Sequence, residues 1–197
     1  MAAIARSALR VSAVPRADNR LRLVLDAAAR LFREKGYAST SMRDIATASG
    51  MLAGSLYYHF PSKEALLIAV YGEGVGHITS AVNAALARDG DPWERLERAC
   101  AAHLESLLSE SDYAQVVVRV RPDDVPEVAR ELTALRDGYE RTFAQAVNAL
   151  PLPRPTDRRA LKLMLLGALN WSQTWYRAGR DSPAGIARSF VRLLRDS

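Results

Sequence analysis

The sequence of 197 residues is 49% hydrophobic and 25% charged, which allows one medium-sized domain or a small domain followed by a larger one. The single cysteine, Cys100, excludes an intrachain disulfide and a thiolate zinc cluster and fits a reducing compartment. No apolar run approaches the length of a bilayer span, so we expect a soluble, cytoplasmic protein.

The net charge of +5 is distributed unevenly along the chain. Residues 1–63 contain 10 Lys and Arg against 4 Asp and Glu, whereas residues 64–197 contain 17 against 18. A basic N-terminal part suits a polyanionic partner, because phosphate contacts supply most of the non-specific affinity for nucleic acid. A solvated basic surface explains the same numbers, and composition alone does not separate the two interpretations.

Residues 1–19 contain three arginines among small residues and lack the continuous apolar core of a secretory signal. This composition fits a disordered basic arm, an organelle transit peptide or a segment upstream of the true start codon. We interpret the segment as a disordered basic arm, although the sequence does not distinguish among the three.

From residue 20 onward, apolar residues follow the spacing of three and four that is typical of helices. The first helix is expected to end at Gly36, which suits a left-handed cap. Ser41 and Asp44 form a capping box for the second helix. Gly50 supplies a tight turn, and a third helix is expected over about residues 52–59.

Pro61 stops the third helix, and Ser62 caps a long fourth helix that should reach about Leu86. The Asp-Pro-Trp-Glu run at residues 91–94 places an acidic cap, a proline and a glutamate at the start of the next helix. Three further helix starts are expected, at Asp124, Thr156 and Ser182.

Residues 113–120 have strand propensity because they contain a β-branched run. A single strand without a partner elsewhere in the chain cannot form a sheet, so we interpret the segment as a short helix. The sequence therefore predicts an all-α fold with about nine helices.

Residues 41–63 are the most informative part of the chain. They are expected to form two short helices joined by a glycine turn, and a proline and a new helix cap follow directly. This is a helix-turn-helix, which places its second helix in the major groove of DNA.

Residues 20–67 resemble a TetR-type transcriptional regulator. The resemblance lies in FREKGY at residues 32–37, TSMRDIA at 40–46 and GSLYYHFPSKEAL at 54–66. It implies a three-helix DNA-binding domain over residues 20–66 and a larger helical domain over residues 67–197 for effector binding and dimerisation.

The same resemblance implies a ligand-responsive regulator, by default a repressor, that binds a palindromic operator as a homodimer and is released by a small, largely apolar effector. Residues 167–176 are similar to TetR-type regulators of lipid and steroid breakdown, some of which respond to acyl-CoA thioesters. A DNA-binding adaptor, whose helical domain only dimerises or holds a protein partner, is the alternative.

The DNA-facing residues that the resemblance implies form two groups. Hydroxyls, an ammonium and helix N-terminal amides are typical phosphate donors. The group expected mainly at phosphates comprises Thr40, Ser41, Ser55, Tyr58 and Lys63. The group expected at or near base edges comprises Leu52, Ala53, Gly54, Tyr57 and His59.

Several of these residues have a plainer structural interpretation. Tyr57 is equally consistent with a half-buried core residue, and a lone histidine such as His59 is often a packing or capping residue. Positions 52 and 53 often carry polar readers in the family, whereas this chain has Leu52 and Ala53. Apolar readers favour thymine methyl groups, so we expect DNA shape and phosphate contacts to supply much of the discrimination.

An effector site requires an apolar pocket with a few polar groups. Aromatic residues at helical spacing are more often core residues, and surface arginines are common. A cation would suit an acidic or thioester-phosphate ligand. The candidates are Tyr113, Arg119, Arg121, Tyr139, Phe143, Asn170, Trp171 and Gln173.

The glycines at 72, 74 and 76 loosely resemble a phosphate-binding loop, but no strand precedes them and they lie inside an expected helix. Each should weaken that helix by about 1 kcal/mol relative to alanine, so we expect a flexible joint between the two domains.

The last two helices are apolar enough to pair with a second subunit as a four-helix interface. The expected interface residues are Leu165, Leu169, Ile186, Phe190 and Leu193. An enzyme is the weaker hypothesis, because three histidines and one cysteine form no nucleophile elbow, triad order or metal cluster. Neither a cofactor nor a metal is expected.

Overall fold

The computed structural model describes residues 16–196, and within that range it contains nine α-helices, two 3₁₀ turns and no strand. The expected all-α fold is therefore confirmed. The helices are α1 (Arg16–Lys35), α2 (Met42–Ser49), α3 (Ala53–His59), α4 (Lys63–Leu86), α5 (Pro92–Leu107), α6 (Asp112–Arg119), α7 (Ala129–Asn148), α8 (Arg158–Trp175) and α9 (Pro183–Arg195). The expectation for residues 1–19 lies mostly outside the described residues.

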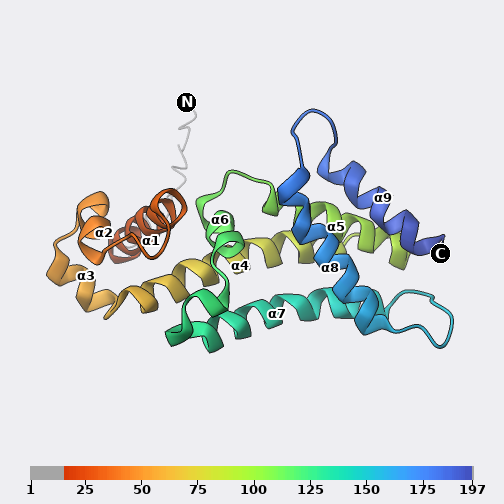
Figure 1. The fold of residues 1–197 in the computed structure, drawn as a ribbon, viewed down its shortest axis with the longest axis horizontal. Helices are drawn as coiled ribbons and strands as arrows, with labels where there is room; N and C mark the ends of the chain where they lie inside the picture. The colour runs from red at the N-terminus through yellow and green to blue at the C-terminus, as the bar shows by residue number, and fades with distance from the viewer. Residues whose placement is uncertain (1–15, 197) are drawn as a thin grey trace, which may run out of the picture.

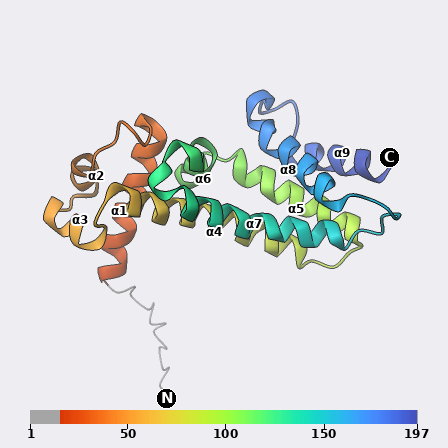
Figure 2. The same cartoon turned by 60° about the horizontal axis from the view of Figure 1, so that its bottom comes forward.

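Helices α1, α2 and α3 lie together at one end of an elongated molecule, and α4 runs from them into a larger group formed by α5 to α9 (Figures 1 and 2). Within the larger group, helix α6 lies nearest the N-terminal helices and packs against both α1 and α4. The long helix α4 is therefore shared by both parts of the molecule.

Local signals set the geometry of the small N-terminal group. Gly36 and Gly50 adopt the left-handed conformation with φ of 83° and 66°. The Ser41 hydroxyl accepts a hydrogen bond from the Asp44 amide, while the Asp44 carboxylate accepts from the Ser41 amide. Leu56 of α3 is fully buried in the core of this group. These caps and this anchor fix the direction of α3.

Helix α4 is long and apolar enough, by length and composition alone, to cross a membrane. The sequence interpretation did not identify it as such a run. In the structure α4 packs against α1, α5, α6 and α7, and its buried residues belong to two hydrophobic cores. Its apolar character is that of a central core helix.

Three helix starts can be compared with expectation. Residues 112–119 form a helix, as expected for the ambiguous segment. The segment after it contains two 3₁₀ turns, Pro122–Asp124 and Pro126–Val128, so α7 begins at Ala129 and not near Asp124. The prolines lack the amide hydrogen that a continuing helix needs. Helix α8 is capped by Asp157, not by Thr156.

The glycines of α4 do not interrupt it, because the helix is continuous from Lys63 to Leu86. A Cβ atom on Gly74 would lie 2.6 Å from the Tyr113 carbonyl oxygen and 2.7 Å from Val117 Cγ2. No atom would lie within 4 Å of a Cβ on Gly76. Gly74 therefore lets the backbone of α6 approach α4 closely, which is a packing role and not that of a joint.

Alanine at these two positions should have different effects on stability. Gly76→Ala should raise the free energy of unfolding by about 1 kcal/mol, because alanine favours the helix and meets nothing. Gly74→Ala gains the same propensity but forces α6 outward, and such overpacking costs roughly 1–3 kcal/mol. Urea unfolding of both variants measures the difference, and equal stability would contradict the close packing.

Candidate nucleic-acid interface and effector cavity

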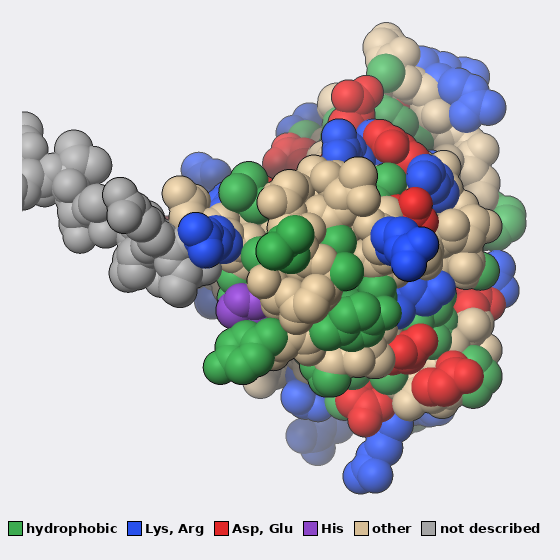
Figure 3. Space-filling model, turned by 90° about the vertical axis from the view of Figure 1, so that its left-hand side faces the viewer, with side chains coloured by type: hydrophobic (Ala, Val, Ile, Leu, Met, Phe, Trp, Pro, Cys, Tyr) green, Lys and Arg blue, Asp and Glu red, His purple; other side chains and the backbone are tan. Residues whose placement is uncertain are grey.

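Helix α3 forms a ridge at the end of the molecule. Its side chains are exposed except for Leu56, which anchors it to the core. Leu52 is 80% exposed at the cap, Tyr58 is 86% exposed, and Tyr57 is half-exposed. Figure 3 views this end and shows hydrophobic side chains and a histidine exposed among Lys and Arg. A protruding helix with this mixture of side chains suits insertion into a groove of duplex DNA.

Two hollows flank the ridge. The first lies between α3 and α1 and is lined by Arg20, Leu23, Ser55 and Tyr58, among others. The second lies on the other side and is lined by residues 38–42, Tyr57 and residues 61–63. The two tyrosines of α3 therefore face opposite sides of the ridge.

The structure brings most of the predicted DNA-facing residues onto this one surface. The exposed members are Ser41, Leu52, Ala53, Gly54, Ser55, Tyr57, Tyr58 and His59. Lys63 is partly buried: its ammonium donates to the Tyr37 carbonyl at 2.9 Å and lies 4.3 Å from the centre of the Tyr37 ring. Tyr37 in turn donates its hydroxyl to Glu64, and burial together with this carboxylate raises the tyrosine pKa.

Thr40 differs from the expectation. It is 2% exposed, and its hydroxyl donates to the carbonyl oxygens of Gly36 at 2.8 Å and Leu31 at 3.3 Å. A hydroxyl used in this way is not available to a phosphate. Thr40 instead fastens the end of α1 to the start of α2, which corrects its assignment as a phosphate contact through the side chain.

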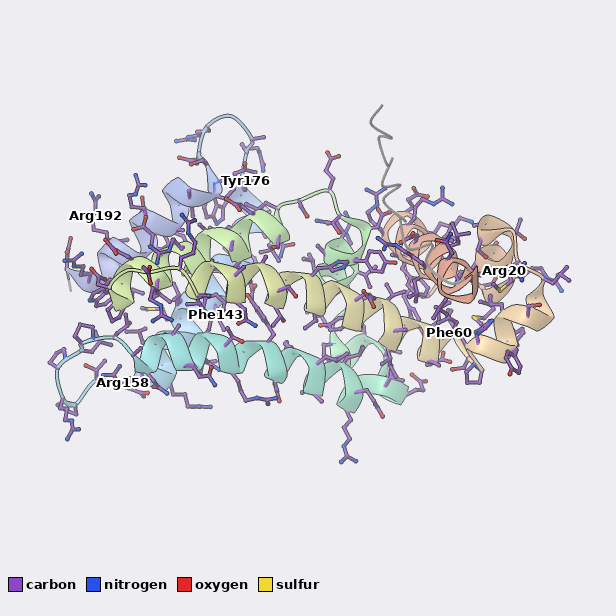
Figure 4. All side chains as sticks on the ribbon, turned by 180° about the vertical axis from the view of Figure 1, so that it is seen from behind. Arg20, Phe60, Phe143, Arg158, Tyr176 and Arg192 are labelled. Atoms are coloured by element: carbon purple, nitrogen blue, oxygen red, sulfur yellow. The ribbon has the colours of Figure 1, made fainter. Side chains whose placement is uncertain are left out.

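The larger part of the molecule contains a cavity of about 210 Å³ between α4, α5, α6, α7 and α8. Its walls are mainly apolar and include Tyr71, Val75, Leu107, Val117 and Leu166. Phe143 lies beside it, at a distance from Arg20 and Phe60 of the DNA-facing end (Figure 4). The cavity is therefore well separated from α3.

One wall of the cavity carries a chain of three polar side chains from three helices. Nδ1 of His103 (α5) is hydrogen-bonded to the hydroxyl of Tyr139 (α7), and its Nε2 lies 3.1 Å from Oδ1 of Asn170 (α8). Because an amide oxygen only accepts, Nε2 carries the proton and Nδ1 accepts from the tyrosine hydroxyl. Burial lowers the pKa of His103 to about 4, so these three hydrogen-bonded side chains are uncharged at neutral pH. We name Tyr139, His103 and Asn170 the neutral chain.

Positively charged side chains line the cavity from α7 and from the segment after α6. Arg121 and Arg136 are both exposed and both line the cavity; we name them the arginine pair. Glu140 also lines it, but Lys162 of α8 holds that carboxylate at 2.8 Å, and Arg136 Nε lies 3.9 Å from it. The lining therefore has an excess of positive charge.

Four predicted effector residues line this cavity, namely Arg121, Tyr139, Asn170 and Gln173. Phe143 is buried against the rings of His103 and Tyr139. Trp171 is 67% exposed on the outer face of α8 and is not part of the cavity. His103, Tyr71 and Arg136 were not predicted, and their spacing on three different helices gives no local signal.

Tyr113 and Arg119, also predicted at the effector site, lie instead between α6 and α1. The Tyr113 hydroxyl donates to Asp26 at 2.7 Å, and Arg119 donates to the carbonyl oxygen of Arg33 at 3.1 Å. Arg33 also forms an ion pair with Asp112 at 2.8 Å. Three polar contacts therefore join α6 to the first helix of the DNA-facing end.

The expected dimer residues are mostly internal. Leu165, Leu169 and Ile186 belong to the core of the chain itself, and Phe190 is packed against that core. Only Leu193 is largely exposed, at 70%. The assignment of the three buried residues to a subunit interface is therefore wrong. The exposed large apolar residues of α8 are Leu163, Met164, Trp171 and Trp175.

Two family models match the chain. Residues 24–70 match the bacterial regulatory proteins of the tetR family, and residues 89–197 match the tetracyclin repressor-like C-terminal domain. The chain belongs to the tetR family. Within residues 16–196 of this tetR-family protein, no group of three or more His, Cys, Asp or Glu residues is placed to hold a metal ion.

Individual relatives agree with the family assignment. The HTH-type transcriptional repressor KstR2 of Mycobacterium tuberculosis is 35% identical over 95 residues, which are 48% of this chain and 46% of that protein. The match thus spans less than half of this curated relative. The TetR family transcriptional regulator PfmR from Thermus thermophilus has a TM-score of 0.70 at 30% identity, with 87% of this chain and 96% of that chain covered. AibR, solved in complex with isovaleryl coenzyme A and operator DNA, has a TM-score of 0.73 at 26% identity, with 88% and 97% covered.

The buried histidine should make stability depend on pH. His103 has a pKa of about 4 in the folded chain, below the value of about 6.5 for a free imidazole. The stability of the folded chain is unaffected by His103 protonation above pH 6.5. The free energy of unfolding decreases as the pH falls toward 4, because only the unfolded chain then binds a proton at this histidine. The loss is on the order of 3 kcal/mol.

Urea unfolding between pH 7 and pH 4 measures this effect. His103→Gln should show a shallower loss of stability than the wild type over this range. The same substitution at the exposed His77, which lies 3.7 Å from Glu73, is the control for replacing a histidine outside the cavity. Parallel profiles for wild type and His103→Gln would contradict a neutral, buried His103.

Proposed function

We propose that this chain is a cytoplasmic, DNA-binding transcriptional regulator that acts as a homodimer, most simply as a repressor, and that a small molecule in the cavity lowers its affinity for a palindromic operator. Residues 20–66 would form the DNA-binding domain, and residues 67–197 would bind the effector and the second subunit. The observation that carries this proposal is that α6 both lines the cavity and is bonded to α1.

The α3 ridge supports the DNA-binding part of the proposal. Its exposed side chains include the hydroxyls of Ser55, Tyr57 and Tyr58 and the imidazole of His59, which are suited to donate hydrogen bonds to phosphates and base edges. Leu52 at the start of the ridge has no polar atom in its side chain and is suited to a thymine methyl group. KstR2 is a repressor and AibR was solved with operator DNA, which agrees with this assignment for a related chain.

Coupling between cavity and ridge would run through α6. Val117 and Val118 of α6 line the cavity, so a ligand that fills it contacts this helix directly. Any displacement of α6 strains its contacts with Asp26 and Arg33 of α1. A ligand that prefers the displaced arrangement would then lower DNA affinity in proportion to its differential affinity for the two states.

The dimer would use the outer face of α8. Leu163, Gly167 and Trp171 are exposed and recur every four residues, and the exposed Met164 lies three residues before Gly167, so the four share one face of the helix. An exposed apolar face of this kind marks an interaction surface. Leu193 of α9 would add to it. Two copies joined in this way would present two α3 ridges to successive major grooves, about 34–36 Å apart.

The adaptor alternative is less well supported. An adaptor that only dimerises or holds a protein partner has no need of a cavity, and a filled core would favour it. The partly apolar cavity of about 210 Å³ favours a ligand. An acyl-CoA would place its acyl group there and leave its nucleotide outside.

Selection of duplexes from a random-sequence pool tests the function. The purified protein should enrich two inverted half-sites whose centres lie about one helical turn apart. Thymine should be preferred at the base pair that faces Leu52, because an apolar side chain contacts the thymine methyl. A fixed G·C pair at that position would contradict the role of Leu52, and enrichment of no sequence would contradict the function.

A charged substitution on α8 tests the proposed dimer face. Met164→Glu should yield a monomer in size-exclusion chromatography with light scattering and should lose the selected duplex, because a charge would be buried in an apolar interface. Arg141→Glu, an exposed change on α7, is the matched control. A dimeric Met164→Glu protein would place the interface elsewhere.

A further inference from the structure

The size of the cavity limits the ligand to a small molecule. A volume of about 210 Å³ lies below the range of roughly 300–1,000 Å³ that is common for ligand cavities. The apolar residues on α4, α5 and α6 favour a carbon skeleton over a sugar or a nucleotide. The enclosed part of the ligand is therefore a short carbon chain or a single ring.

The neutral chain selects an uncharged oxygen. His103 uses both ring nitrogens within the chain, and Tyr139 uses its only hydrogen on His103. Asn170 accepts through its side-chain oxygen, and among the described residues its amide nitrogen donates to no partner. Asn170 is therefore a free donor on the cavity wall. A carbonyl or hydroxyl oxygen matches it, and no charged group lies in the chain to favour an ionic ligand there.

The arginine pair selects an anion. Arg121 and Arg136 give the lining two positive charges against one carboxylate, Glu140, which Lys162 holds at 2.8 Å and which lies 3.9 Å from Arg136 Nε. Arg136 lies near enough to Tyr71, on the same cavity lining, for its charge to oppose the rise that burial causes in the pKa of that tyrosine. Guanidinium groups bind carboxylates with two parallel hydrogen bonds, so a carboxylate is the anion of matching geometry and small size.

Both selecting features line one cavity. Arg136 and Tyr139 are three residues apart on α7, about 4.5 Å along the helix axis, and Tyr139 is linked through His103 to Asn170. A long acyl chain or a bulky ring system would extend beyond the cavity.

We infer that the effector is a short-chain carboxylate with a second, uncharged oxygen, such as an oxo acid or hydroxy acid. Its carboxylate binds the arginine pair, and its carbonyl or hydroxyl oxygen accepts a hydrogen bond from Asn170 beside Tyr139 and His103. This inference rests on the proposed function, since it names the ligand class of the same cavity.

Calorimetric titration with a matched series of compounds tests the inference. The probes are 4-oxopentanoate, 5-oxohexanoate and 6-oxoheptanoate, each compared with the plain acid of equal chain length and with its own methyl ester. At least one oxo acid should bind five-fold or more tightly than both of its partners. Equal affinity for oxo acid and plain acid, or for acid and ester, would overturn the inference, as would the absence of binding by every oxo acid.

Two substitutions separate the two contacts. Arg136→Gln should reduce the preference for acid over ester at least threefold, because only Arg121 then remains for the carboxylate, and should keep the preference for the oxo group. Asn170→Leu should abolish the preference for the oxo group and keep the preference for acid over ester. Arg136 is exposed, whereas Asn170→Leu also removes the acceptor of the buried His103 Nε2 proton and should lower the melting temperature. A cooperative melting transition and a native helical circular dichroism spectrum therefore verify folding of both variants. Arg141→Gln, on the same helix but not in the cavity lining, should keep both preferences. Loss of both preferences in either folded variant, or of neither, would contradict the assignment.

The duplex obtained by selection distinguishes a wrong ligand class from a wrong function. Release of that duplex by the preferred oxo acid supports the inference. Release by isovaleryl-CoA but by no oxo acid would overturn the ligand class and leave the regulator intact. Failure to bind any duplex without ligand would instead refute the proposed function.

Discussion

The arrangement of the whole molecule depends on the close approach of α6 to α4 at Gly74. With a hydrogen in place of a side chain at this position, the Tyr113 carbonyl and Val117 can lie against the backbone of α4. That contact sets the distance between α6 and the central helix α4. It thereby places one part of α6 in the wall of the cavity and another part in reach of α1. A single backbone contact thus positions both halves of the proposed switch.

The structure gives two residues of α6 a different role from the one that the sequence predicted. Tyr113 and Arg119 have the chemistry of ligand-binding residues, but the structure uses them to attach α6 to Asp26 and Arg33. The ligand would instead contact the apolar part of α6 and the neutral chain beyond it. In the proposed switch, recognition and transmission would therefore involve different residues of neighbouring helices, and a small change at the cavity would reach the ridge through a rigid element.

Local signals predicted the DNA-facing end well. The Ser41–Asp44 capping box and the glycine turn at Gly50 act over a few residues, so the sequence contains them in full. The cavity could not be predicted in this way, because His103, Tyr139 and Asn170 meet only when α5, α7 and α8 pack. The same limit explains other errors. An apolar helix such as α8 buries only some of its apolar residues in its own core, and only tertiary packing shows which leucines those are. Thr40 was misassigned because its burial depends on the turn between α1 and α2.

The most direct measurement of the coupling needs no ligand. Fluorescence anisotropy titration of the selected duplex compares wild type, Gly74→Ala and Gly76→Ala at a temperature where all three are folded. If α6 positions the DNA-facing helices, Gly74→Ala should weaken DNA binding by about tenfold, a change of about 1.4 kcal/mol, while Gly76→Ala stays within about twofold of the wild type. Wild-type affinity of a folded Gly74→Ala protein would contradict the central role of the α4–α6 contact.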